Sequence, residues 1–377
     1  MKHLSLLLLL LPFACFAQLR IEGRVVNATD GKSIPDASVY LTNTTIGQKS
    51  NADGTFSLNI LRAGQYDLIV TAIGYEGYRE TVMVNESVKL PDIKILPKTT
   101  MMKDVRIVGK DPKRARKLRI FKEQFLGSSA IANQCKILNP EILDLRFTKG
   151  EKQLLAKTND FLEIENVALG YKLKYLVSEF VLDEEAGTVV YEGAVLFEEK
   201  DGTPSEKSRR EKNRLEVYFG SSTHFLRQVL ANQADVNYLV RNFCIKGIDP
   251  HLSNTFKYDT LHPKDYIHPT DKRGIYAMSY NDQVDIYHYL SNHTRRMGAG
   301  LVVTITFLEP DMFFDSNGII LNRKSVLFRN AWGKSRVAEL LPIDFWPETE
   351  EKSLPGDVEK NNDVPYQRIR PALGGLR

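Results

Sequence analysis

Few features of this sequence point directly to a function, and several absences narrow the choice. It has only three cysteines in 377 residues. Loss of the start segment with Cys15 would leave Cys135 and Cys244, which could form one disulfide or stay as two buried thiols. The formal net charge of +4 is too small to indicate a nucleic acid as partner. No later run of about 18 uninterrupted apolar residues occurs, so we expect no transmembrane segment after signal cleavage.

The motifs of common hydrolases and nucleotide-binding proteins are also missing. No histidine is followed by the His-x-x-Glu or His-Glu-x-x-His spacing of zinc peptidases. The Gly-Lys-Ser strings at 31–33 and 333–335 lack the earlier glycine of a phosphate-binding loop. The string 220–224 lacks the second glycine of a nucleophile elbow. We therefore predict no catalytic residue and no cofactor.

The chain begins with an apparent export signal. Residues 1–17 contain a basic start, an apolar stretch from Leu4 to Leu11 and the small residue Ala17, which is typical of a cleaved signal peptide. Acylation of Cys15 is the alternative, but Pro12 stands where a lipobox has an aliphatic residue. We expect an exported protein of the periplasm or outer membrane, or a secreted one.

Short runs of alternating apolar and polar residues follow, separated by turn formers, which is typical of a β-sandwich. The string 51–54 predicts a tight hairpin, because Asp53 and Gly54 tolerate the positive φ that such turns need. Calcium at Asp53 is the alternative, but one carboxylate cannot supply about six oxygen ligands. The expected strands span 19–26 and 38–41, and two more carry Phe56, Leu58 and Ile60, and Tyr66, Leu68 and Val70.

Several strings in this region resemble one known family. They are Gly23-Arg24-Val25, 34–39, 51–56, Gly64-Gln65-Tyr66 and Gly74-Tyr75. As a set they resemble the carboxypeptidase regulatory-like domain of exported Bacteroidetes proteins, over residues 18–97. The resemblance implies a prealbumin-like (Ig-like), seven-stranded β-sandwich. Such a domain accompanies the catalytic domain of metallocarboxypeptidases and precedes a plug domain in outer-membrane receptors, and it has no catalytic residues of its own.

Residues 98–126 are predicted to be a basic linker. The string 101–109 resembles the segment that leads into the plug of TonB-dependent receptors. The spacing of Leu118, Phe121 and Phe125 then predicts an amphipathic helix over 112–126. We favour a linker helix with a solvated basic face over a membrane-surface or docking helix.

Residues 127–347 are predicted to form a mostly antiparallel α+β domain. The string 184–187 predicts a hairpin turn between two strands. Ser222 or Thr223 predicts the cap of a helix that ends near Asn232. The expected strands are 161–168, 173–182, 188–198, 214–219, 274–280, 283–290, 300–307 and 325–328.

Two polar segments are expected to be irregular. Residues 204–214, with Arg209-Arg210, are interpreted as an exposed hairpin loop, and residues 348–377 as a disordered tail. Three other strings resemble the same exported family: Tyr218 to Leu226, Asp315 to Trp332 and Arg336 to Phe345. That family has no assigned reaction, so it supplies no functional residue.

Histidines are the best remaining candidates for a site. Three of them, His262, His268 and His288, could converge on a metal ion with nearby aspartates. Their spacing matches no known site type, and the His-Pro pairs at 262–263 and 268–269 indicate an irregular loop. We therefore favour surface or hydrogen-bonding histidines. The cluster in the sequence consists of His251, His262, His268, His288 and His293.

A carboxylate pair gives a further alternative. Glu163 and Glu165 share one face of a predicted strand, whereas a glycosidase needs two carboxylates placed across a cleft. Paired acids on a solvated face are the favoured interpretation.

Three functions stay open. The favoured one is a non-enzymatic cell-envelope binding or scaffold protein, whose sandwich positions a C-terminal domain that binds an outer-membrane protein or a surface glycan. The string 104–109 suggests an accessory protein of a TonB-dependent receptor. The third is a hydrolase with an unrecognised metal or carboxylate site within 251–293.

Overall fold

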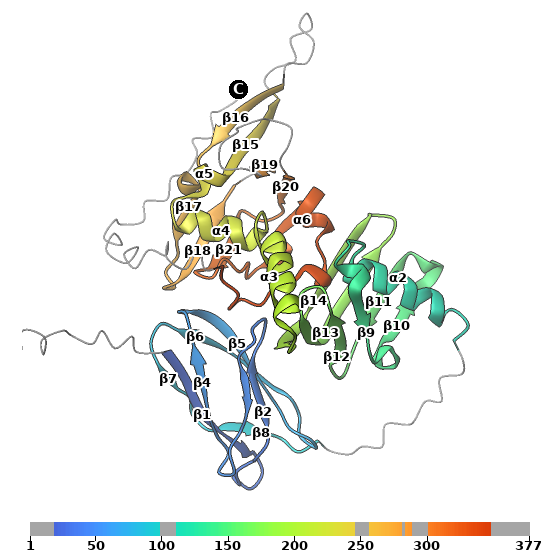
Figure 1. Ribbon diagram of the computed structural model, residues 1–377, viewed down its shortest axis with the longest axis vertical. Coiled ribbons are helices and arrows are strands. Elements are labelled where there is room, and N and C mark those ends of the chain that lie inside the picture. The colour runs from blue at the N-terminus through green and yellow to red at the C-terminus, as the bar shows by residue number, and fades with distance from the viewer. Residues whose placement is uncertain (1–18, 99–110, 246–255, 281–282, 289–300, 348–377) are drawn as a thin grey trace, which may run out of the picture. The chain divides into compact units, whose positions relative to one another are not determined.

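The computed structural model describes residues 19–98, 111–245, 256–280, 283–288 and 301–347 (Figure 1). Within these residues the chain is mainly β, with short helices beside antiparallel sheets, which confirms the predicted fold class. All of the sheets belong to one compact unit, Met1–Phe345. The expected signal peptide, the receptor-like string 101–109 and the tail 348–377 lie outside the described residues.

The N-terminal part of the chain is a β-sandwich. One sheet has the order β4-β1-β7, with β8 also paired to β1, and the other has the order β3-β2-β5-β6. Alternate side chains of both sheets point inward and form one shared core. The strands are β1 Leu19–Asn27, β2 Ser38–Leu41, β3 Gly47–Lys49, β4 Thr55–Ile60, β5 Gly64–Thr71, β6 Tyr78–Val84, β7 Val88–Lys89 and β8 Ile93–Ile95.

The sandwich departs from two local predictions. It has eight strands where the family resemblance implies seven, and Pro91, which has no N–H for the ladder, lies between β7 and β8, both of which pair with β1. The turn predicted at 51–54 is present, but it links β3 and β4 of different sheets and so is not a hairpin. In that turn, Asp53 Oδ1 accepts hydrogen bonds from the Thr55 backbone N–H at 3.0 Å and hydroxyl at 2.6 Å. The carboxylate therefore stabilises the turn.

A six-stranded antiparallel sheet follows, in the order β10-β11-β13-β12-β9, with β14 paired to β13. The hairpin predicted at 184–187 is present, since Asp183 pairs with Thr188 across β13 and β14. Three of its strands were predicted, and β9, β10 and β11 were not. The bounds are β9 Cys135–Ile137, β10 Asp144–Phe147, β11 Gln153–Lys157, β12 Leu162–Asn166, β13 Tyr171–Asp183 and β14 Thr188–Glu199.

The predicted amphipathic helix is present as α2, Arg114–Leu126. Its apolar side chains Phe121 and Phe125 are fully buried and belong to the core of the six-stranded sheet. Phe125 makes edge-to-face contacts with Tyr175 and Tyr191, with ring centroids 5.1 and 5.5 Å apart. α2 is therefore a core element of this sheet, and the linker-helix interpretation is corrected accordingly.

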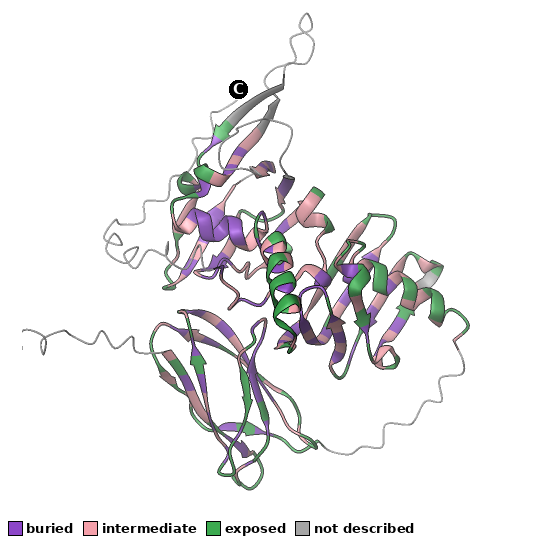
Figure 2. Cartoon of the chain, viewed as in Figure 1, coloured by how far each residue is buried: buried purple, intermediate pink, exposed green. Residues whose placement is uncertain are grey.

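The loop predicted at 204–214 and the strand predicted at 214–219 are wrong, because Pro204–Tyr218 forms helix α3. The Thr203 hydroxyl and the Glu206 side chain form a reciprocal capping box, with Pro204 in the first turn. Arg210, Arg214 and Tyr218 recur at intervals of four and are buried, whereas most other positions of α3 are exposed (Figure 2). The run of charges is thus a helix that turns two arginines inward.

The remaining elements form a five-stranded sheet, β16-β15-β19-β20-β22, and a three-stranded sheet, β17-β18-β21, around a separate core. The predicted helix is present as α4 and is mostly buried, but its cap is Ser221 rather than Ser222 or Thr223 (Figure 2). The bounds are α4 Ser222–Leu230, α5 Ala234–Asn237, β15 Tyr238–Ile245, β16 Phe256–Leu261, β17 Ile267–Pro269, β18 Ile275–Ser279, β19 Gln283–His288, β20 Leu301–Phe307, β21 Asp311–Asp315, β22 Val326–Arg329 and α6 Asn330–Lys334.

Candidate functional site

The three candidate histidines have different neighbours. His262 is exposed, and its Nδ1 lies 3.1 Å from Asp235 Oδ2. His268 of β17 contacts a serine, and His288 of β19 contacts aromatic rings. In the described part of the chain, no group of three His, Cys, Asp or Glu residues could hold a metal ion. A metal at these histidines stays a prediction, and His251 and His293 lie outside the described residues.

His268 belongs to a small polar cluster that superficially resembles a nucleophile and its base. Its Nε2 lies 2.9 Å from Ser279 Oγ, and the same hydroxyl donates a short hydrogen bond to Asp311. A hydroxyl has one proton to donate. Because the Asp311 carboxylate takes it, His268 must donate to Ser279 rather than accept from it. The arrangement therefore ties β17, β18 and β21 together and does not activate the serine as a nucleophile.

The carboxylate pair is engaged with lysines. Glu163 Oε2 lies 3.0 Å from Lys172 Nζ, and Glu165 forms an ion pair with Lys200, which lowers the pKa of Glu165. Both side chains are half-buried on the sheet. A general acid needs a raised pKa, so Glu165 is not suited to that role.

Cys135 is a free thiol at the start of β9. Burial raises its pKa to about 12, and its Sγ lies 3.5 Å from the carbonyl oxygen of Ile131. A thiol with a raised pKa forms little thiolate near neutral pH, so it is a poor nucleophile. The unpaired alternative thus holds for Cys135, while the side chain of Cys244 lies outside the described residues.

A buried imidazole organises the turn between α3 and α4. The Gly220 backbone N–H donates to His224 Nδ1 at 3.2 Å, so this nitrogen accepts and the Tyr238 hydroxyl must donate to it, at 2.5 Å. Gly220 has φ of 86°, and a Cβ there would lie 3.0 Å from His288 Nδ1. Trp332 Nε1 donates to the Gly220 carbonyl at 2.7 Å. The imidazoles of His224 and His288, with ring centroids 5.8 Å apart, are therefore packed under one tight turn.

We expect this histidine pair to lower the free energy of unfolding as the pH falls. Burial, and then the neighbouring His224, lower the pKa of His288 from 6.5 to about 4. Its contribution is fully present above about pH 6.5 and is lost as pH falls toward 4, because the unfolded chain then binds the additional proton. After discounting for partial exposure, we expect a loss of about 1–2 kcal/mol.

Urea unfolding of wild type and His288→Phe from pH 7 to pH 4 checks this expectation. The variant keeps an aromatic ring and should lose that part of the pH dependence, whereas His262→Phe, at an exposed position, should retain it. If the free energy of unfolding fell equally with pH for wild type and His288→Phe, the pH dependence could not be assigned to His288.

The second structural focus is the contact between the sandwich and the later sheets. The Ile343 N–H donates to the Asn43 carbonyl at 2.6 Å, and the Thr45 N–H donates to Asp344 at 3.0 Å. Ile343 is buried in the core of the sandwich. On the other side of the same loop, Asn43 N–H donates to the Val195 carbonyl of β14 at 2.6 Å. Main-chain hydrogen bonds thus attach the sandwich to two later parts of the chain.

Arg227 of α4 binds the segment that carries Ile343 from the side of the later sheets. It was not predicted as a key residue. Its Nε donates to the Asn317 carbonyl at 2.9 Å, its Nη1 to Phe345 at 3.0 Å and its Nη2 to Ile343 at 2.9 Å. The side chain is only 5% exposed and stacks over Tyr218. The three strings that resemble the exported family therefore meet at one guanidinium.

The turn after β21 also reaches the sandwich. Asp315 is 1% exposed, and its Oδ1 accepts from the backbone N–H groups of Asn317 and Ile319 at 3.0 and 2.9 Å. The Ser316 hydroxyl donates to the Ala63 carbonyl at 3.1 Å. A Cβ at Gly64 would lie 2.2 Å from Asn317 Nδ2, so the Asn317 side chain can lie against this backbone only because glycine is present. We call the contacts of 315–317 and 343–345 with the sandwich, together with the hydrogen bonds of Arg227 to those two segments, the junction.

An open groove of about 650 Å³ lies beside α2. Its wall includes apolar and basic side chains, and Arg119 and Lys122 are its cations. The lining residues are Ala115, Leu118, Arg119, Lys122, Glu123, Leu126, Gly127, Ser128, Ala132, Asn133 and Cys135. This volume lies in the range of binding pockets, and the groove is the concave feature on which we base a binding proposal below.

Membrane insertion through a helix finds no support in the described residues. None of the helices there is both long and apolar enough to cross a bilayer.

Comparison with known proteins identifies the N-terminal region and leaves the remainder unassigned. No curated protein matches the chain. Similar solved structures include a type II cohesin–X–dockerin complex of Acetivibrio cellulolyticus, at 18% identity over 21% of this chain and 58% of that chain, with a TM-score of 0.20. The pilus 2b backbone protein of group B streptococcus is 17% identical over 22% of this chain and 42% of that chain, with a TM-score of 0.19. A DUF3823 family protein of Bacteroides ovatus is 10% identical over 49% of this chain and 82% of that chain, with a TM-score of 0.18.

These structural likenesses are too distant to assign an activity, and this chain spans less than two thirds of the first two structures. The family match is more informative, because it falls on the sandwich built from β1 to β8 and on the strings singled out in the sequence. The family model of the CarboxypepD_reg-like domain matches residues 21–107, and the chain therefore carries a CarboxypepD_reg-like domain in its N-terminal region.

Proposed function

We propose that the protein is a non-enzymatic binding scaffold of the bacterial cell envelope, exported to the periplasm or outer membrane. In this proposal the sandwich holds the later sheets in a fixed position, and those sheets bind a partner. The junction carries the argument: main-chain hydrogen bonds from Asn43 and Thr45, together with buried Ile343, join the sandwich to distant segments. Such contacts favour a rigid platform over a tethered module.

The polar side chains considered for catalysis support the same proposal. Glu165 is in an ion pair with Lys200, and Ser279 donates to Asp311. His224 accepts from a backbone N–H and from a tyrosine. Groups held in this way stabilise the fold and are not poised to abstract a proton from a bound substrate.

Co-purification from envelope fractions tests the proposal. We expect a C-terminally tagged chain to fractionate with the outer membrane and to enrich an outer-membrane protein or a surface glycan over a tag-only control. Recovery of a TonB-dependent receptor would identify the partner suggested by the string 104–109. Ile343→Asp, which places a charge in the sandwich core, should reduce recovery by about tenfold by loosening the junction.

Two results would contradict the proposal. One is a tagged chain that stays in the cytoplasmic fraction. The other is an envelope preparation in which neither protein nor glycan is enriched, although the tagged chain is folded.

A further inference from the structure

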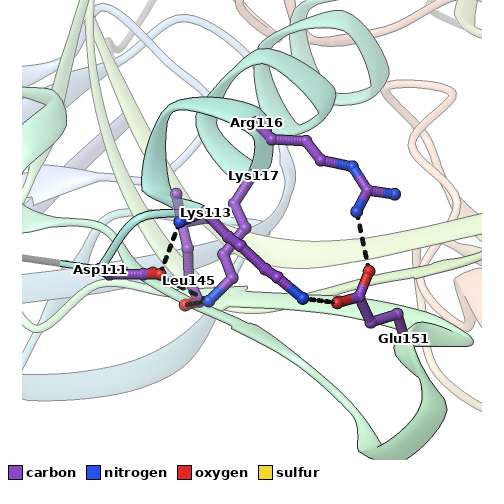
Figure 3. A network of polar contacts seen from close by, with 6 residues as sticks. All are labelled: Asp111, Lys113, Arg116, Lys117, Leu145 and Glu151. Atoms are coloured by element: carbon purple, nitrogen blue, oxygen red, sulfur yellow. Dashed lines mark hydrogen bonds and ion pairs between the residues drawn. The ribbon is translucent and has the colours of Figure 1, made fainter.

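The basic residues of α2 fall into two groups, one of which is used inside the protein. Lys113 and Arg116 both form ion pairs with Glu151, and Arg116 Nη1 lies 2.8 Å from Glu151 Oε2 (Figure 3). Lys117 Nζ lies 2.9 Å from Asp111 Oδ2 and 3.4 Å from the Leu145 carbonyl (Figure 3). These contacts fasten the start of the helix to β10 and to the turn at 149–151 that follows it.

The second group is unused within the described residues. Arg119 and Lys122 are exposed, and neither side chain has an ion pair or hydrogen bond to another described residue. They are three positions apart, which places them on neighbouring turns of one helix face. Both line the groove of about 650 Å³ beside α2. The free cations of the helix are therefore the ones at the concave surface.

The groove also has an apolar lining. Leu126 and Ala132 are 5% and 6% exposed and also belong to the wall, with Leu118 beside them. Leu118 and Leu126 lie at the edge of the sheet's core, in which Phe121 and Phe125 are fully buried. A membrane-surface helix needs an uncovered apolar face, and α2 has none of sufficient size.

We propose that this groove binds an acidic peptide segment of a partner protein. Carboxylates of the segment would pair with Arg119 and Lys122, and a neighbouring apolar side chain would lie on Leu118 and Leu126. Glu123 also lines the groove, so a uniformly acidic stretch would be repelled there. The recognised segment thus alternates acidic and apolar or neutral residues. This inference rests on the proposed function and specifies its partner.

Fluorescence anisotropy with a short labelled peptide of alternating Glu and Leu tests the inference on the chain without residues 1–17. We expect binding that weakens between about 50 and 300 mM salt. Arg119→Glu with Lys122→Glu should reduce the affinity by about tenfold or more, because two attractive pairs become repulsive. Lys207→Glu with Arg209→Glu makes the same charge change on exposed positions of α3 and should alter affinity by less than about twofold.

A second variant tests the apolar part of the groove. Ala115→Trp places a bulky side chain at an exposed lining position and should weaken binding without changing the dependence on salt. Thermal unfolding of each variant should match wild type, since all substituted positions are exposed.

Three outcomes would overturn the inference. They are equal loss of affinity in both charge-reversal variants, no binding of the Glu-Leu peptide at low salt, and binding of phosphatidylglycerol vesicles in its place. Failure here is distinguishable from failure of the proposed function. If tagged Arg119→Glu with Lys122→Glu still recovers the envelope partner, only the assignment of the groove is contradicted. If tagged wild type recovers no partner, the scaffold proposal itself is contradicted.

Discussion

Replacing Arg227 with alanine is expected to lower the free energy of unfolding by about 3–5 kcal/mol. The substitution removes three charge-assisted donors and leaves the carbonyl oxygens of Asn317, Ile343 and Phe345 without them. It also empties space beside the Tyr218 ring. Urea unfolding at neutral pH measures the loss, and limited proteolysis should show earlier cleavage near residues 337–345 because that segment is no longer held.

Arg209→Ala is the matched control, because Arg209 is an exposed arginine of α3. We expect it to change stability by less than about 0.5 kcal/mol. The loss of stability for Arg227→Lys should lie between those of Arg227→Ala and Arg209→Ala, since an ammonium group cannot reproduce the planar fork that reaches three carbonyls. A loss below about 1 kcal/mol for Arg227→Ala would contradict the role of this side chain as the centre of the junction.

The second large effect is expected at Phe125 of α2. Phe125→Ala should cost about 3–5 kcal/mol, because it opens a cavity where the ring is fully buried. The ring contacts Phe121 at 4.7 Å and Tyr175 at 5.1 Å between centroids. Chemical unfolding followed by far-ultraviolet circular dichroism measures the loss. If α2 were a solvated linker, the same substitution would leave stability almost unchanged.

Phe219→Ala provides the comparison for that experiment. Phe219 is 41% exposed, so less apolar surface is returned to water, and we expect a cost of about 1 kcal/mol. A cost at Phe125 no larger than that at Phe219 would show that α2 is not a core element.

Strands with strict alternation were predictable from sequence, and their positions agree with the structure. β4 follows the period-two rule, and so does β13 on either side of a bulge near Val177, because one face of each strand meets a core. β9 and β10 were missed because they are only three and four residues long, too short for a period to be recognised. Tertiary pairing, rather than local pattern, determines such strands.

The error at α3 has a clear physical reason. Pro204, a high density of charges and few apolar residues suggested a loop, yet Thr203 and Glu206 have the spacing of a capping box. This spacing indicates the start of a helix even where charges are dense. The burial of Arg210 and Arg214 was not predictable, because arginine is seldom buried unless carbonyl or aromatic partners surround it.

The candidate site was less predictable than the fold. Clustering of histidines along the chain did not imply a shared neighbourhood: His262 contacts Asp235, whereas His268 contacts Ser279. Arg227 carries no motif, and its partners come from residues 317, 343 and 345. Only the three-dimensional arrangement brings those carbonyl oxygens to one guanidinium.

Burial of Ile343 in the sandwich has a consequence for biosynthesis. Thr45 and Asp344 form a contact across 299 positions of the chain, so the sandwich is completed only after the sheets that lie between them in sequence have been synthesised. Contacts between residues this distant form late and slow the folding of a chain. Until Ile343 has been synthesised, part of the apolar interior of the sandwich is therefore uncovered, a state prone to aggregation.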